Sequence, residues 1–157
     1  MSAPLEKATA FLRTLQAHVP SGVRTHTLGC ALFVRKGRFL LALRSLLRAR
    51  ALAPDDPSVH KALVRFLHAV GVASLPTTVT RVINGHRNAI GAPAGQSLEA
   101  LNNAYLLKAQ KASDASGASA LMAAAEMQLL LDPAQKQAAA QLVASLPLQT
   151  LSLKLAC

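Results

Sequence analysis

Aromatic residues are scarce in this chain, which has four Phe, one Tyr and no Trp among its 157 residues. Proteins that recognise unpaired nucleic-acid bases usually stack them on aromatic side chains, so this scarcity argues against base recognition. Leu and Ala dominate the composition instead, and both are good helix formers that lose little side-chain freedom in a helix. The composition therefore favours packed helices over a sheet.

Acidic residues are also few, since seven Asp and Glu stand against 17 Lys and Arg, for a formal net charge of +10. A catalytic site that works by proton transfer needs titratable side chains held close together. Here Glu99 and Glu126 stand alone in the sequence, and the neighbouring Asp55 and Asp56 are expected to cap a helix. We therefore expect no catalytic residues and no enzymatic activity of the chain's own.

The basic residues are concentrated in the first part of the chain, because 12 of the 17 lie between Arg13 and Arg87 and only Asp55 and Asp56 oppose them there. Such an asymmetry favours a polyanionic partner, such as RNA, a ribosome surface or an acidic protein face, because long-range attraction and counterion release need no base reading. The alternative is a charged surface that only keeps the protein in solution.

Signals for metal binding and secretion are missing as well. Cys30 and Cys157 have no metal-ligand spacing, and Cys30 lies in an apolar stretch, where a buried thiol in a reducing compartment is expected. The N-terminus lacks the uninterrupted apolar stretch of a secretory signal, and Pro147 interrupts the longest uncharged stretch, so we expect a cytoplasmic protein without a membrane span. We expect no metal and no cofactor, since no two histidines have the four-residue spacing of zinc-binding helices; they are His18, His26, His60, His68 and His86.

The apolar periodicity and its interruptions predict about eight helices. Two of their starts have a clear physical cause, since Asp56-Pro57 and Asp132-Pro133 each place a capping carboxylate before a proline at the first helical position. The predicted helices run from Pro4 to His18, Val23 to Val34, Arg38 to Leu52, Pro57 to Val72, Pro76 to Ile90, Ser97 to Lys111, Ala118 to Leu131 and Pro133 to Leu146.

The connections between these helices are mostly short, which makes neighbouring helices antiparallel. We therefore predict an all-α fold, an array of antiparallel helical hairpins of the α-solenoid type, in which each hairpin needs a neighbour to bury its second face. Flexible connections are expected at residues 91–96 and 113–117, which are rich in small and polar residues. A single helical-repeat domain over residues 1–146 follows, with an apolar C-terminal tail at residues 147–157 that we expect to dock on the array or on a partner.

The segment from Thr25 to Pro57 has the pattern of a tetratricopeptide repeat, which is a 34-residue pair of helices. With Pro54 placed at the end of the second helix, Gly37 falls in the turn between the helices, where it permits a tight backbone conformation. A weaker hairpin of the same kind covers residues 120–146. Small residues should let the two helices approach while large ones fill the gaps between them; the expected buried positions are Phe39, Ala42, Leu46, Ala49 and Leu52.

Basic residues flank the turn at Gly37 and continue along the helix that follows it. The arginines at the start and middle of that helix fall within about a third of its circumference, so they should form one exposed stripe. A phosphate backbone or an acidic protein face would fit this stripe, and a solvated surface is again the alternative. The candidate contact residues for an anionic partner are Arg35, Lys36, Arg38, Arg44 and Arg48.

The residues Val34 to Leu41, VRKGRFLL, followed by Pro57 and His60, resemble the C-terminal region of the auxiliary subunit of the NatA N-terminal acetyltransferase complex. In that tetratricopeptide-repeat family, a helix ending in an R-K-G/E-K/R-F-L-L motif is followed by a second helix, a polar turn and a histidine shortly after a proline. The segment from Ala124 to Pro133 is similar to the family's S-A-A-K-M-x-x-x-L-D-P segment, although Glu126 stands where the family often has Lys. The resemblance covers about residues 4–146.

This resemblance implies a non-catalytic auxiliary or scaffold subunit of the NatA complex, or a fragment of one, that supports co-translational N-terminal acetylation. Family members are longer helical-repeat proteins that wrap the catalytic acetyltransferase subunit, dock on the ribosome and in some lineages bind a small ubiquitin-associated-domain regulator. The Q/R-x-x-G-x-G/A loop that holds acetyl-coenzyme A does not occur in this sequence. Partners in a membrane or sequence-specific nucleic-acid partners are not expected.

A different function stays open beside this one. The same helical hairpins could belong to a generic tetratricopeptide-like adaptor that binds an unrelated protein. Retention of an acetyltransferase subunit by the immobilised chain would favour the NatA interpretation, and its absence would favour the adaptor. Binding of acetyl-coenzyme A by the isolated chain would instead indicate an enzyme.

Overall fold

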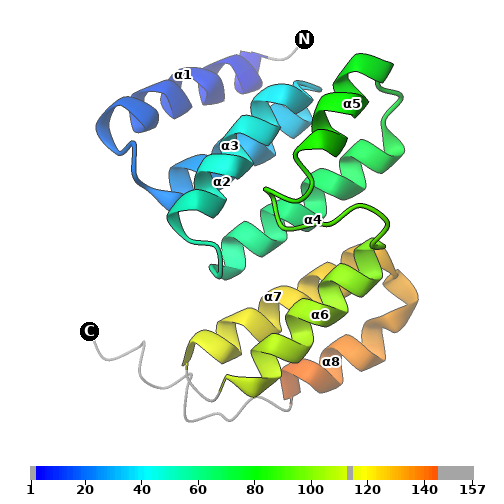
Figure 1. Ribbon diagram of the computed structural model, residues 1–157. Helices are drawn as coiled ribbons and strands as arrows, with labels where there is room; N and C mark the ends of the chain where they lie inside the picture. Colours follow the sequence, from blue (N-terminus) through cyan, green and yellow to red (C-terminus); the bar gives the residue numbers. More distant parts are fainter. Residues whose placement is uncertain (1–2, 113–114, 145–157) are drawn as a thin grey trace. The chain divides into compact units, whose positions relative to one another are not determined.

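A computed structural model describes residues 3–112 and 115–144, and within these residues it has eight α-helices, one short 3₁₀ helix and no strand (Figure 1). The all-α class and the number of helices predicted from the sequence are therefore confirmed. The helices are α1 (Ala3–His18), α2 (Val23–Arg35), α3 (Phe39–Leu52), α4 (Pro57–Val72), α5 (Thr77–Gly85), α6 (Leu98–Lys111), α7 (Ala115–Leu131), the 3₁₀ helix η1 (Pro133–Gln135) and α8 (Lys136–Ala144).

The contacts of the chain gather in two compact units, Met1–Gln96 and Ser97–Cys157. The first unit contains α1 to α5 and the second contains α6 to α8. The single domain expected over residues 1–146 stays a prediction. The apolar tail expected at residues 147–157, and Cys157 within it, lie outside the described residues.

The α2–α3 hairpin is the centre of the first unit, with α1 packed on α2, α4 packed on both helices, and α5 packed on α3 (Figure 1). Gly37 makes the turn of this hairpin with a φ of 68°, a left-handed conformation that glycine adopts at little cost. Within the helices, Gly29 lies so close to α3 that a Cβ atom there would be 3.2 Å from Ser45 Oγ. Small side chains thus allow the close approach that the sequence pattern predicts.

The buried seam of α3 contains Phe39, Ala42, Leu46 and Ala49, as predicted, but the prediction for Leu52 is wrong because 44% of this residue is exposed. Leu52 is the last residue of α3, where the helix ends before the turn that leads to Pro57. Its side chain therefore lies at the edge of the packed hairpin and stays partly exposed.

The capping predictions are confirmed at both Asp-Pro pairs. The Asp56 carboxylate accepts a hydrogen bond from the Ser58 backbone N–H at 2.7 Å, and the Asp132 carboxylate accepts one from the Ala134 N–H at 3.0 Å. The α-helix predicted to start at Pro133 starts later, because the turn after Asp132 is the 3₁₀ helix η1 and α8 begins only at Lys136. Short 3₁₀ turns at helix starts are common.

The helix predicted to run from Pro76 to Ile90 is shorter than expected, since α5 ends at Gly85. The next residues form turns, in which the His86 N–H bonds the Ile83 carbonyl. The buried Ile90 and Ala92 then anchor the segment, and Gly91, with a φ of 79°, lies against the guanidinium of Arg50. Part of the connection expected to be flexible at residues 91–96 is therefore packed.

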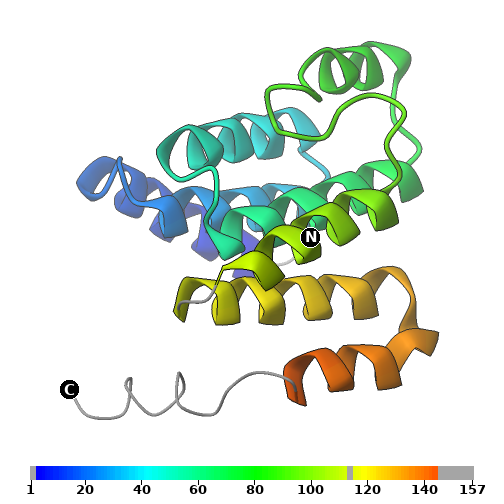
Figure 2. The same ribbon diagram turned by 60° about the horizontal axis from the view of Figure 1, so that its bottom comes forward.

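In the second unit, α7 lies between α6 and α8 (Figure 2). A row of alanines, with Met127, forms its buried face, and the buried Asn102 of α6 donates a hydrogen bond from Nδ2 to the Ala124 carbonyl at 2.9 Å. The packing of α8 on α7 confirms a second helical hairpin within residues 120–144. None of the helices in the described part of the chain is long and apolar enough to span a bilayer.

Candidate functional site

The arginines predicted to form a stripe are exposed at the start and along the middle of α3. Arg38 is the N-cap residue of α3, and Arg44 and Arg48 follow one helical turn apart; all three are exposed. The buried seam, which includes Phe39 and Ala42, holds one side of α3 against the core, so Arg44 and Arg48 project from the opposite side. We name Arg38, Arg44 and Arg48 the arginine face.

No side-chain hydrogen bond or ion pair joins the guanidinium groups of the arginine face to another residue of the described part of the chain. Arg35, at the end of α2, is exposed in the same way. The guanidinium groups of these four residues are therefore available in this structure, and their contact with an anionic partner stays a prediction.

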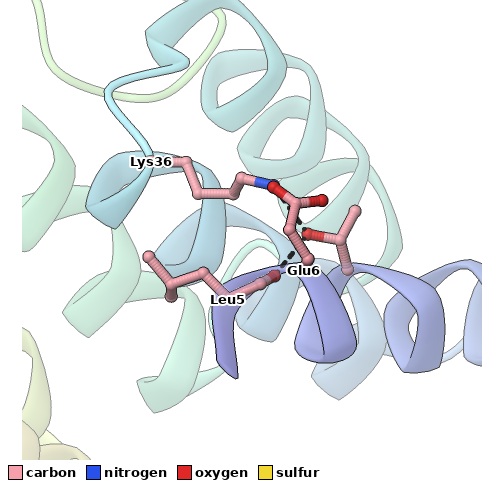
Figure 3. Close-up of polar contacts among 4 residues, drawn as sticks. Leu5, Glu6 and Lys36 are labelled. Carbon is pink, nitrogen blue, oxygen red and sulfur yellow. Dashed lines mark hydrogen bonds and ion pairs between the residues drawn. The ribbon is translucent and has the colours of Figure 1, made fainter. Parts of the chain in front are cut away.

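Lys36, the remaining candidate, has partners within the molecule. Its Nζ donates hydrogen bonds to Glu6 Oε1 at 2.8 Å and to Thr9 Oγ1 at 3.0 Å, and only 14% of its side chain is exposed (Figure 3). Thr9 Oγ1 in turn donates to the Leu5 carbonyl at 2.7 Å. Lys36 thus ties the first turns of α1 to the end of α2, a role that the sequence interpretation missed.

The pairing of Glu6 with Lys36 predicts a pH dependence. Lys36 lowers the pKa of Glu6 below the ordinary value of 4.5. The larger cause is the hydrogen bond that Lys36 donates, and the next is its positive charge. A lowered folded-state pKa gives a contribution to stability that is complete above the unfolded-state pKa and is lost as the pH falls through the folded-state pKa. The attachment of α1 should therefore weaken only in acid, below about pH 4.5.

An NMR titration of the Glu6 carboxyl carbon measures this effect directly. In Lys36→Met the pKa of Glu6 should rise towards its ordinary value, whereas in Lys136→Met, which removes a lysine from the other unit, it should not change. An unchanged Glu6 titration in Lys36→Met would show that the contact does not form in solution.

An apolar groove lies at the start of α3, beside Arg38. It has a volume of about 370 Å³ and joins the first turn of α3 to the start of α5. Leu40 and Leu41 are 45% and 37% exposed there. Its lining residues are Gly37, Arg38, Phe39, Leu40, Leu41, Leu75, Pro76 and Val79.

The sequence interpretation did not identify this groove. One signal was present, since Phe39 to Leu43 are five consecutive apolar or small residues, more than the buried stripe of one amphipathic helix accommodates. The contribution of α5 could not be read in the same way, because Leu75 and Val79 are distant in sequence and meet α3 only in the folded chain.

The titratable groups of the described residues include no set of three or more His, Cys, Asp or Glu side chains that could hold a metal ion. Cys30 is buried as predicted, and burial raises the pKa of its thiol to about 12. Because the thiolate is the reactive form, Cys30 packs as a small apolar side chain at neutral pH.

Comparison with known proteins gives a consistent set of relatives. The chain is 33% identical over 137 residues to "N-alpha-acetyltransferase 16, NatA auxiliary subunit" of Homo sapiens, a match that covers 87% of this chain and 15% of that protein. It is 30% identical over 145 residues to "N-terminal acetyltransferase A complex auxiliary subunit NAA15" of Arabidopsis thaliana, covering 89% of this chain and 16% of that protein. The corresponding Mus musculus protein is 31% identical over 137 residues. No family model matches the chain.

Fold and surface together define an all-α helical-hairpin protein with an exposed basic and apolar side on one hairpin. By sequence, the chain belongs with the NatA auxiliary subunits and corresponds to part of their C-terminal region. This confirms the resemblance identified from the VRKGRFLL and Asp-Pro segments. The chain spans about 15% of the length of the curated relatives it matches.

Proposed function

We propose that this chain acts as a non-catalytic scaffold piece of a NatA N-terminal acetyltransferase complex. The observation that supports the proposal is the similarity to NatA auxiliary subunits over 87% to 89% of the chain. The array of helical hairpins suits such a role, because hairpin arrays of the tetratricopeptide type present extended faces to protein partners. The place of action would be the cytoplasm, where nascent chains emerge from ribosomes.

The partner proposed first is the catalytic acetyltransferase subunit, since an auxiliary subunit acts through it. A second is the ribosome, for which the exposed arginine face and Arg35 supply positive charge without aromatic side chains for reading bases. A small ubiquitin-associated-domain regulator is a third. These contacts would support co-translational N-terminal acetylation without adding a catalytic group.

Co-elution with the matching NatA catalytic subunit in size-exclusion chromatography tests the proposal. At physiological salt we expect a stable one-to-one species. Because a chain with a net charge of +10 can bind acidic proteins without specificity, the complex should also persist at about 0.5 M salt, where the screening length is only a few ångströms.

Separate elution of the two proteins, with the chain folded and monomeric, would contradict the proposal. It would leave the generic adaptor as the better description of the chain. Co-elution that disappears at the higher salt concentration would likewise count against a specific scaffold contact.

A further inference from the structure

The apolar groove between α3 and α5 differs from an ordinary surface depression in its electrostatics. Helices α3 and α5 both begin at it, and neither has a side-chain hydrogen bond at its N-cap or an acidic residue in its first turn. In contrast, α4 and α6 are capped by Asp56 and Ser97. The N-terminal N–H groups of a helix carry a partial positive charge, so two uncapped helix starts add to the positive charge of Arg38 at this groove.

No acidic residue stands among the groove's lining residues in the described part of the chain. Glu6 lies near enough to feel the charge of Arg38, but its carboxylate accepts the hydrogen bond from Lys36. Arg44 and Arg48 extend the positive side along α3 away from the groove, with Arg48 about 15 Å from Arg38 at 1.5 Å per residue.

We propose that this groove binds an acidic, amphipathic segment of a partner protein. A leucine-like side chain would enter the groove against Leu41 and Val79, while carboxylates of the same segment would face Arg38 and the arginine face. Charge complementarity is the reason for this choice of occupant, because the apolar lining and the positive rim require both properties in one ligand. The inference rests on the proposed function only in taking the chain to bind protein partners.

An RNA ligand fits the groove less well. Bases bind mainly by stacking on exposed aromatic rings, and Phe39, the aromatic residue of the lining, is 9% exposed and belongs to the core. The volume of about 370 Å³ is at the lower end of the range for small-ligand pockets, which suits one or two aliphatic side chains. A helical segment in an apolar groove is also a common mode of peptide recognition.

The test uses the full chain and a fluorescent acidic peptide, Ac-EELLEELLEE-amide, with Ac-EESSEESSEE-amide as the matched peptide without leucines. Fluorescence anisotropy at physiological salt should show binding of the leucine peptide and at least tenfold weaker binding of the serine peptide. NMR shifts of the isotope-labelled chain should change mainly at residues 37–41 and 75–79.

Surface variants identify the groove as the binding site. Arg38→Glu and Leu41→Ser should each weaken the leucine peptide about tenfold or more. Their matched controls, Arg24→Glu on α2 and Leu107→Ser on α6, also change exposed residues and should change the affinity less than about twofold. Circular dichroism checks that all four variants keep the helical fold.

Several results would overturn the inference. Equal binding of the two peptides, or equal weakening by Arg24→Glu and Arg38→Glu, would mean that net charge alone attracts the ligand. Absence of shift changes at the groove would mean that the peptide binds elsewhere on the chain. Two other results would assign the groove to another occupant. They are self-association of the chain through the groove and oligouridylate binding that depends on Leu41. If the peptide does not bind at the groove but the chain co-elutes with the NatA catalytic subunit, the proposed function stands and this inference fails. If the peptide binds at the groove but the chain does not co-elute, the chain is an acidic-peptide adaptor.

Discussion

Phe66→Ala is expected to lower the free energy of unfolding by about 3–5 kcal/mol, the usual cost of removing a buried phenylalanine ring. Phe66 is fully buried in α4, which packs against both helices of the α2–α3 hairpin. The remaining side chains can fill only part of the space left by the ring. Small domains are stable by about 5–15 kcal/mol, so the loss takes a large share of the total. Urea unfolding followed by circular dichroism at 222 nm measures it.

The chain offers a matched control for this change in Phe11, which is 72% exposed on α1. Phe11→Ala removes the same ring from a surface position, and such changes usually alter stability by less than about 0.5 kcal/mol. A similar shift of the urea midpoint in both variants would mean that α4 does not form the core of the first unit in solution.

Local signals predicted most of the helices correctly because their causes lie within a few residues. The carboxylate of Asp56 caps the helix that starts at Pro57, and Gly37 makes the turn that the repeat pattern requires. Cys30, Ala42 and Leu46 are buried as their apolar surroundings indicate. These features need only the helical period and the chemistry of turns and caps.

Two of the errors concern residues whose environment depends on distant parts of the chain. Lys36 looked like a member of an exposed basic cluster, and its partner Glu6 lies 30 residues away on another helix. Ile90 fitted a continuing helix because it lies seven residues after Ile83, yet the chain turns after Gly85 and buries Ile90 by another route. Periodicity alone does not distinguish these arrangements.

The groove shows the same limit in a functional feature. The exposed leucines on α3 form a groove only because the start of α5 lies beside them, and the sequence does not show that these two helices are neighbours. The positive charge of the site was partly predictable, since Arg38, Arg44 and Arg48 follow from helical spacing and are exposed as expected. The combination of charge with an apolar pocket required the fold.

Changing the three residues of the arginine face to glutamate, as Arg38→Glu, Arg44→Glu and Arg48→Glu together, is expected to reduce ribosome association by about a hundredfold or more at low salt. Each lost contact with a phosphate lowers the dependence of log K on log salt by about 0.7–0.9. The triple variant should therefore bind with a salt slope smaller by about 2–3. Sedimentation with purified ribosomes over a series of salt concentrations measures both quantities.

The matched control changes three other exposed arginines, Arg13, Arg24 and Arg81, to glutamate. Both triple variants then have the same formal net charge, so a long-range attraction that depends only on the total charge would weaken equally in both. A surface in direct contact with phosphates predicts a clear loss for the arginine face and a small one for the control. Unchanged sedimentation of the arginine-face variant at low salt would exclude this face from ribosome binding. In that case the peptide experiment decides whether Arg38, Arg44 and Arg48 serve an acidic protein instead.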